Sequence, residues 1–461
     1  MSRARPIHLV GIGGAGMSGL ARLAAEAGYR VSGTDRDDSA LLEGLRREGI
    51  DARAGHSAEA VPPDAAALVV STAIAADNPE RAEAARRGIE VLHRSELLAE
   101  LMAGRRGLAV AGAHGKSTTS GMLVTALGRA SACVGAAIAG GGGTGAFWGT
   151  GPWFVAEADE SDRSLLNLFP EAAILLNVDH DHHATFASLD EVKEVFRRFV
   201  AALPPGGVLV VGPDEAARDC AADAVCEVRL VGDLPGSFCA VERAGRAAGF
   251  TLALADGRRV DVPLAVGGRH NAENAACALA LADWCEVPLV DAAARLAGFT
   301  GVGRRMELRG VAGGVEVVDD YAHHPAEIRA TLAAARERAP GRIVVIFQPH
   351  LPSRTRALWR ELGEALGAAD VVVVTEVYLA REPADPAVGG RDVAGAVPGP
   401  ARAVFAPTPA DAAAAALAEI RPGDLVITMG AGDITTLGRE LVSRLEEHLD
   451  DGTRRDSTPP A

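Results

Sequence analysis

The amino-acid sequence predicts an α/β protein of several domains with mainly parallel sheets, and three observations support this class. An apolar strand, a glycine turn and a helix follow one another repeatedly, with new starts near residues 7, 107 and 315, which is the order of βαβ units. The chain has 461 residues, and a prior of about 150 residues per domain gives about three domains. Its content of 48% hydrophobic and 23% charged residues is that of a globular protein.

The first domain is expected to span residues 1–104. Continuous apolar runs at 7–12 and 67–72 predict buried strands, and the helical spacing at 17–28 and 79–88 ends in glycine both times. We therefore expect alternating strands and helices throughout this part of the chain.

The first strand runs directly into a glycine pattern. Gly11, Gly13 and Gly16 form G-x-G-x-x-G before a predicted helix, and Asp35 stands at the end of the next apolar run. Taken alone, this is the dinucleotide-binding fingerprint, and it raises the question whether the protein is a nicotinamide enzyme.

A second domain is expected at residues 105–300 and a third at 301–448. In the second, residues 107–130 again read as strand, glycine turn and helix. Further strands are predicted at 153–159, 171–178 and 207–212, with helices at 189–203 and 271–287 and a small antiparallel patch within 212–265. In the third, strands are predicted at 315–321, 342–348, 370–378 and 424–430, with helices at 325–339 and 356–367. Residues 449–461 are polar and end in proline, so we expect a disordered tail.

Charge and cysteine content exclude several classes of protein. The net charge of −15 argues against a nucleic-acid or acidic-membrane binder, which needs a basic surface. The six cysteines lie far apart with no C-x-x-C pair, which is typical of reduced thiols in the cytoplasm. No run of roughly 18 apolar residues exists to insert into a membrane, and the N-terminal run reads as a first strand rather than a signal peptide. We expect a cytoplasmic monomer or weak homodimer.

A second glycine loop, Gly112–Thr119, changes the functional hypothesis. Its Gly-Lys-Ser at a strand-to-helix turn suits a triphosphate, because backbone N–H groups cradle phosphates, lysine reaches the outer ones and the hydroxyl takes Mg²⁺. Val110 stands where the common P-loop has glycine, so the loop is a compressed G-x-x-G-K-S. The alternative is a flexible turn with a solvated lysine.

Acidic and histidine groups follow two later strands. The run Glu157–Asp162 and the three histidines His180, His182 and His183 stand directly after apolar strands. Beside a phosphate loop, such ligands suit a divalent cation, with oxygen-rich ligation favouring Mg²⁺ or Mn²⁺. Zinc is an alternative for the histidines, and plain surface exposure is the alternative for Asp159, Glu160 and Asp162.

Two further clusters open helices. His270 and Asn271 begin a predicted helix, where the amide could read a base edge or cap the helix. Arg304 and Arg305 precede Asp319 and Asp320, and arginine suits forked phosphate contacts. The histidine pair before Pro325 could orient a nucleotide or belong to an ordinary exposed turn.

Taken together, the motifs resemble those of the Mur ligases. GIGGAGMSGLA, GAHGKSTT, AEADESD, NVDHDH, GRHNAENA, GVGRRMELRG, DDYAHHPAEI, FQPHLPSRT and TMGAGDI occur here in the family's order, between about residues 6 and 448. The resemblance implies a Rossmann-like N-terminal domain for a UDP-sugar, a P-loop-type central domain for ATP and a Rossmann-like C-terminal domain for an amino acid.

The activity implied by this resemblance is ATP-dependent amide ligation in cytoplasmic peptidoglycan precursor synthesis. ATP would phosphorylate the lactyl carboxylate of UDP-N-acetylmuramate, and L-alanine would attack the acyl phosphate. The first glycine loop would then hold UDP rather than a nicotinamide cofactor, because both ligands share a pyrophosphate. Asp35 would contact uridine or sugar hydroxyls.

The resemblance also implies site residues. The catalytic residues would be Lys116, Glu157 and His182, and the Mg²⁺ ligands Ser117, Glu157 and His182. ATP would be bound by Gly112, Ala113, His114, Gly115, Lys116, Ser117, Thr118, His270, Asn271, Arg305 and Asp320. The UDP-sugar would be bound by Gly13, Gly14, Ala15, Gly16, Met17, Ser18, Asp35, Ser71 and Arg94. The amino acid would be bound by His350, Tyr378 and Arg381.

The sequence departs from the family pattern in a few places. Ser117 replaces a common threonine, and His183 and Ala184 stand where many members have Met and Asp. Lys193 is mis-spaced for the carbamylated lysine of related ligases and is expected to be a solvated helix residue. A ligase that reattaches recycled tripeptide and a non-catalytic UDP-sugar sensor are the alternatives.

Overall fold

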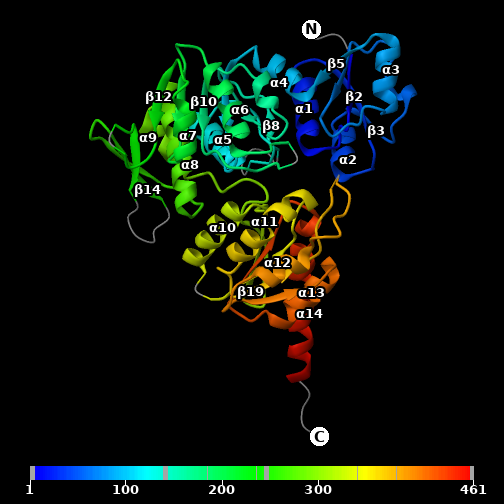
Figure 1. Cartoon of the computed structure of the whole chain (residues 1–461), viewed down its shortest axis with the longest axis vertical. Coiled ribbons are helices and arrows are strands. Elements are labelled where there is room, and N and C mark those ends of the chain that lie inside the picture. The colour runs from blue at the N-terminus through cyan, green and yellow to red at the C-terminus, as the bar shows by residue number, and fades with distance from the viewer. Residues whose placement is uncertain are drawn as a thin grey trace. The chain divides into compact units, whose positions relative to one another are not determined.

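The computed structural model describes most of the chain, and its contacts divide the chain into two compact units. Described are residues 6–138, 144–183, 185–234, 236–242, 249–339, 341–380 and 382–456. The first unit holds the residues up to His180 together with Ser188–Ala265 and Ala272–Thr300. The second holds Asp181–Ala187, Val266–Asn271 and the residues from Gly301 onward. Figure 1 colours the chain from blue to red along its length.

The first unit begins with a five-stranded parallel sheet in the order β3-β2-β1-β4-β5. Its strands are β1 Pro6–Val10, β2 Arg30–Asp35, β3 Asp51–Ala54, β4 Ala67–Val70 and β5 Glu90–His93. Its helices are α1 Ala15–Glu26, α2 Ala40–Arg47, α3 Pro79–Arg87 and α4 Arg94–Met102, with the short η1 Ala58–Ala60. The strand order reverses at β1, and the carboxyl end of a sheet at such a point is where ligands bind.

A seven-stranded sheet follows in the order β12-β11-β10-β6-β9-β7-β8, and every described pairing except β7–β8 is parallel. Its strands are β6 Arg106–Ala111, β7 Ser131–Cys133, β8 Ala146–Phe147, β9 Trp153–Ala158, β10 Ala172–Leu175, β11 Val208–Val211 and β12 Glu227–Leu230. The accompanying helices are α5 Lys116–Leu127, η2 Ser164–Asn167, α6 Leu189–Ala201 and α7 Glu215–Ala221. The central strands β10 and β11 are buried throughout and β6 is buried after its first residue, Arg106, which explains their apolar sequences.

The small antiparallel patch predicted within residues 212–265 is confirmed. It consists of β13 Cys239–Glu242, β14 Phe250–Leu254 and β15 Arg259–Val262. The helices α8 Arg269–Trp284 and α9 Leu289–Leu296 follow. All six cysteines are free, as expected.

The second unit is built on a six-stranded sheet in the order β16-β17-β21-β18-β19-β20, in which only the edge strand β16 is antiparallel. Its strands are β16 Glu307–Ala312, β17 Val315–Asp320, β18 Ile343–Phe347, β19 Val371–Val374, β20 Arg402–Phe405 and β21 Leu425–Met429. Its helices are α10 Pro325–Arg338, α11 Pro352–Leu366, α12 Gly390–Ala396, α13 Pro409–Glu419, η3 Asp433–Thr436 and α14 Leu437–Asp456. Two apolar clusters form its core, one with α10, α11 and α12 and the other with α13 and α14 (Figure 1, yellow to red).

Helix α14 continues to Asp456, into the stretch for which a disordered tail is expected, and the tail itself stays a prediction. The single Gly452 in this stretch costs a helix only about 1 kcal/mol, and the first proline after it is Pro459. Residues 457–461 lie outside the described part of the chain. No helix among the described residues is long and apolar enough to cross a membrane.

Candidate active site

The first glycine loop is held in place by the end of β2. The N–H of Gly13 donates to Oδ2 of Asp35 at 2.8 Å, and the carbonyl of Thr34 accepts two further N–H groups of the loop. Gly14 is the N-cap of α1, and no side chain caps this helix. The amides of residues 15–17 therefore form an open, positively polarised helix end, which suits an anion.

One carboxylate oxygen of Asp35 thus accepts a hydrogen bond from the loop itself. The contact of Asp35 with uridine or sugar stays a prediction. The side chains of Met17 and Ser18 are buried, so any contact that they make with a ligand has to come from their backbone. Ser71 is half-buried and its carbonyl accepts the N–H of Ile74.

The second glycine loop joins β6 to α5 as predicted. Gly112 and Gly115 have φ values of 136° and 86°, a region that favours glycine, and Gly115 is the N-cap of α5. The side chain of Lys116 folds back over the loop, where Nζ donates to the carbonyl of Gly112 at 2.6 Å and to Glu160 at 2.8 and 3.1 Å. The lysine is therefore not the solvated side chain of the alternative interpretation.

Three carboxylates act on the ammonium group of Lys116. Burial alone would lower the pKa of its ammonium, but the carboxylates of Glu160, Asp159 and Glu157 outweigh burial and raise the pKa. Lys116 is thus a fixed cation at the N-terminus of α5, where phosphates are favoured.

Glu157, at the end of β9, lies beside the same helix. Its Oε1 accepts the N–H of Gly135 at 3.0 Å. Burial raises the pKa of this carboxyl, although hydrogen bonds from Gly135 and the Ser117 hydroxyl oppose the rise. A half-buried carboxylate and a hydroxyl in contact are oxygen donors that fit a hard divalent cation.

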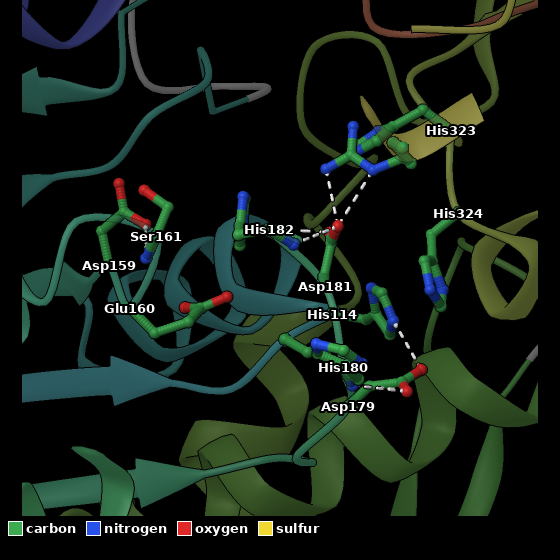
Figure 2. Close-up of polar contacts among 12 residues, drawn as sticks. His114, Asp159, Glu160, Ser161, Asp179, His180, Asp181, His182, His323 and His324 are labelled. Carbon is green, nitrogen blue, oxygen red and sulfur yellow. Dashed lines mark hydrogen bonds and ion pairs between the residues drawn. The ribbon is translucent and has the colours of Figure 1, made fainter. Parts of the chain in front are cut away.

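The acidic run after β9 is not an exposed surface. The side chain of Glu160 is 2% exposed, and Asp159 accepts a hydrogen bond from Arg94 at 2.9 Å. Burial would raise the pKa of Asp159, but Lys116 and Arg94 lower it to about 2. Figure 2 shows Asp159 and Glu160 on this loop. The exposure alternative is therefore wrong for Glu160, whereas the side chain of Asp159 is still 34% exposed.

Sequence reasoning missed two residues that hold the second glycine loop. The Oδ1 of Asn177 accepts the N–H of His114 at 2.8 Å. Asp179 approaches Nε2 of His114 at 3.3 Å, as Figure 2 shows. Both come directly after β10, and no local pattern in the sequence pairs them with His114.

His182 belongs to the second unit and has a φ of 55°, which is unusual for a residue other than glycine. The preceding Asp181, labelled in Figure 2, is almost fully buried. It accepts two hydrogen bonds from Arg354 at 2.7 and 2.9 Å. Arg354 and Asp181 were not among the predicted site residues. Ala184, where the sequence departs from the family pattern, lies outside the described residues.

The predicted nucleotide residues of the second unit are also placed. Arg305 pairs with Glu327 at 3.2 Å, and the residues on either side of it, Arg304 and Met306, have φ values of 60° and 48°. Such strain needs support from its surroundings and is common at functional sites.

Asp320 is 2% exposed and is engaged by its own unit. It accepts hydrogen bonds from the N–H groups of Met306 and Ala322 and from the hydroxyl of Thr331. Burial raises the pKa of this carboxyl, although Arg305 opposes the rise. Its contact with a ribose stays a prediction.

His270 and Asn271 open α8 as expected. Burial, with a contribution from Arg305, lowers the pKa of His270 to about 4. The amide of Asn271 donates to the carbonyl of Gly267 at 2.6 Å, so its side chain binds the preceding turn. Whether it also reads a base stays a prediction.

The structure brings two of the three predicted amino-acid residues together. The rings of His350 and Tyr378 stack with centroids 5.7 Å apart, and Arg354 lies 3.3 Å from Nδ1 of His350. Leu351 between these residues has a φ of 68°. Arg381 lies outside the described residues.

Lys193, by contrast, pairs with Asp219 at 3.2 Å on the surface of α6 and α7. This agrees with its interpretation as an ordinary helix lysine.

Parallel sheets with glycine loops at their carboxyl ends define an α/β protein of the nucleotide-binding class. Three family models match the chain: the Mur ligase family catalytic domain at residues 6–106, the Mur ligase middle domain at 153–282 and the Mur ligase glutamate ligase domain at 304–432. The chain belongs to the Mur ligase family.

Relatives and solved structures agree with this assignment. The chain is 45% identical to a UDP-N-acetylmuramate–L-alanine ligase of Streptomyces coelicolor over 453 residues, which cover 95% of this chain and 97% of the relative. It is 47% identical to the ligase of the same name from Nocardioides sp. over 449 residues, 95% and 96% of the two chains. The crystal structure of the UDP-N-acetylmuramate-alanine ligase from Thermotoga maritima is 27% identical, with a TM-score of 0.81, and the match covers 96% of this chain and 100% of that one.

Proposed function

We propose that the chain catalyses the ATP-dependent ligation of L-alanine to UDP-N-acetylmuramate, a step of peptidoglycan precursor synthesis. Relatives of 45% and 47% identity that carry this name support the proposal along nearly the whole chain. The structural observation that carries it is the charged, half-buried Lys116, paired with the buried Glu160, on a glycine loop at the N-terminus of α5. A protein that only bound a UDP-sugar would have no use for this second phosphate loop.

The chemistry follows from the weakness of a carboxylate as an acylating agent. An oxygen of the lactyl carboxylate attacks the γ-phosphorus of ATP, and ADP leaves. The amine of L-alanine then attacks the acyl carbon, and inorganic phosphate leaves with the bonding electron pair. In this scheme Lys116 stabilises the charge that develops on the β- and γ-phosphates.

The oxygen donors Ser117 and Glu157 fit Mg²⁺ or Mn²⁺, since Glu157 is a half-buried carboxylate in contact with the Ser117 hydroxyl. A bound ion would supply charge neutralisation between the phosphate and the carboxylate. The role of His182 as a further ligand rests on the sequence motif alone and stays a prediction.

Other roles follow the same resemblance. Arg305, Asp320, His270 and Asn271 are proposed for the nucleotide, and His350, Tyr378 and Arg381 for L-alanine. The three domains at 1–104, 105–300 and 301–448, the cytoplasmic location and the monomer or weak homodimer also stay proposals.

The decisive experiment is phosphate release from ATP in the presence of UDP-N-acetylmuramate. We expect release with L-alanine and little without an amine. Release with the recycled tripeptide alone would assign the chain to recycling instead, and no release in any mixture would support a silent sensor.

A further inference from the structure

The N-terminal sheet contains a buried carboxylate, Glu80, that the proposed reaction does not use. Its side chain is completely buried and accepts hydrogen bonds from the Thr34 hydroxyl at 2.7 and 2.9 Å, from Nε2 of His8 at 2.9 Å and from Nδ1 of His56 at 2.8 Å. These partners come from β2, β1 and the turn after β3. One carboxylate on α3 therefore ties together the three strands next to the first glycine loop.

The charge of Glu80 is well supported. Burial alone would raise the pKa of the carboxyl, but the hydrogen bonds from His8, Thr34 and His56 outweigh it, so the pKa is lowered. Glu80 also lies in the first turn of α3, where the helix dipole favours a negative charge.

An ionised carboxylate only accepts hydrogen bonds, so Nδ1 of His56 carries the proton that points to Glu80. In the neutral ring, Nε2 is then a hydrogen-bond acceptor. No group in the described part of the chain bonds this Nε2, and the side chain of His56 remains 20% exposed. Nδ1 of His56 is therefore held by Glu80, whereas Nε2 is available for a hydrogen bond to a ligand.

The open nitrogen lies at the ligand-binding edge of the sheet. Gly55, which precedes His56, donates its N–H to the carbonyl of Asp35 at 2.7 Å, and Asp35 holds the N–H of Gly13. His56 is thus one residue away from the turn that supports the first glycine loop. A nucleoside lies next to the diphosphate that such a loop binds.

We propose that His56 is a binding residue for the uridine part of the nucleotide sugar, that its Nε2 accepts a hydrogen bond from a uridine N–H or O–H donor, and that Glu80 positions it. This inference rests on the proposed function only in taking a UDP-sugar as the ligand. Uracil N3–H and the ribose hydroxyls are the donors that uridine offers.

Replacing His56 by Asn or by Gln can distinguish its hydrogen bond to Glu80 from its hydrogen bond to the ligand. His56→Asn places a nitrogen near the position of Nδ1 and keeps the bond to Glu80, whereas His56→Gln places an amide near the position of Nε2. Titration calorimetry with UDP should show a Kd about three- to tenfold higher for His56→Asn, the value of one hydrogen bond, and a smaller loss for His56→Gln. Glu80→Gln should weaken UDP binding in the same direction.

Two analogues identify the donor. UDP methylated at N3 lacks the base donor, and 2′-deoxy-UDP lacks one ribose donor. One of them should bind the wild type less tightly than UDP does, and that penalty should disappear in His56→Asn. If both analogues keep their full penalty in His56→Asn, or if the folded variant binds UDP as tightly as the wild type, the inference is overturned.

Control variants and ligands distinguish a binding role of His56 from a purely structural role, and the inference from the proposed function. Arg53→Gln changes an exposed side chain on β3, shortly before His56 and paired with Asp51, and should leave the UDP affinity unchanged. ATP affinity should be unchanged in every variant. Equal losses of UDP affinity for Asn and Gln, together with equal losses of thermal stability, would mean a structural role and overturn the inference. A wild type that binds UDP but shows no alanine-dependent phosphate release would contradict the proposed function and leave His56 in place.

Discussion

Arg354 places two of its nitrogens, Nε and Nη2, on a single oxygen of Asp181, 173 residues earlier in the chain. Their side chains are only 4% and 5% exposed. The same oxygen also accepts the N–H of His182 at 2.6 Å. The backbone of the predicted metal ligand is therefore fixed by a buried ion pair in the second unit.

Asp181→Asn should destabilise the second unit by about 3 kcal/mol, because removing one partner of a buried pair leaves an uncompensated charge. Urea unfolding followed by circular dichroism measures this change. Glu440→Gln is the matched control, since Glu440 and Arg444 form an exposed pair one helical turn apart. A control that loses as much stability as Asp181→Asn would contradict this account.

Lys116→Ala should abolish alanine-dependent phosphate release, because no other cation in the described loop takes its place over the phosphates. UDP-N-acetylmuramate binding should stay within about twofold of the wild type, since the first glycine loop is untouched. The chain has only two lysines, which makes Lys193→Ala a natural control with full activity. Loss of UDP-sugar affinity in Lys116→Ala would show that the two sites have been misplaced.

Stability should fall on acidification below the ordinary histidine pKa. The folded-state pKa of His270 is lowered to about 4, first by burial and then by Arg305. Between about pH 6.5 and 4, the unfolded chain binds a proton there that the folded chain does not, so folding weakens as pH falls. Burial likewise lowers the pKa of His323 to about 3, which adds a loss of the same sign.

His270→Asn should flatten this dependence. Allowing for its partial exposure, we expect the variant to remove about 2 kcal/mol of the loss between pH 7 and pH 4. Denaturant unfolding at a series of pH values measures it. An unchanged slope would mean that His270 titrates normally in the folded protein.

Gly432→Ala should impair the use of L-alanine. A methyl group at this position would lie 2.7 Å from Cγ of Tyr378 and would collide with Gln348, so the stacking of Tyr378 on His350 has to change. We expect a KM for L-alanine about tenfold higher, which is about 1.4 kcal/mol, with the KM for ATP unchanged. Gly395→Ala is the control, because a methyl group there meets no atom within 4 Å. Parallel rises in both KM values would point to general damage.

The parts of this fold that could be predicted are those that depend on residues close together in the sequence. The buried strands β1, β6 and β10 are continuous apolar runs, and the loop before α5 carries its glycines and Lys116 in a short motif. Periodicity and turn chemistry act over a few residues, so a single sequence contains them.

Partners distant in the sequence could not be predicted in the same way. The acidic residue Glu160 has the same local pattern whether it faces water or Lys116, and only the tertiary fold chooses between these states. Arg354 is one arginine among several on α11, and its role depends on Asp181. Glu80 looks like an ordinary first-turn acid of α3, although it is one of the most buried carboxylates described.

The division of the chain into units also affects the order in which the parts of the second unit are synthesised and can fold. Asp181–Ala187 belongs to the second unit although the surrounding sequence belongs to the first. Synthesis runs from the N-terminus, so this segment leaves the ribosome long before Arg354 exists to receive it. The residues from Gly301 onward are therefore not sufficient to complete the second unit, which also needs this earlier segment of the chain. A fragment expressed from Gly301 onward would carry Arg354 without the carboxylate that neutralises it.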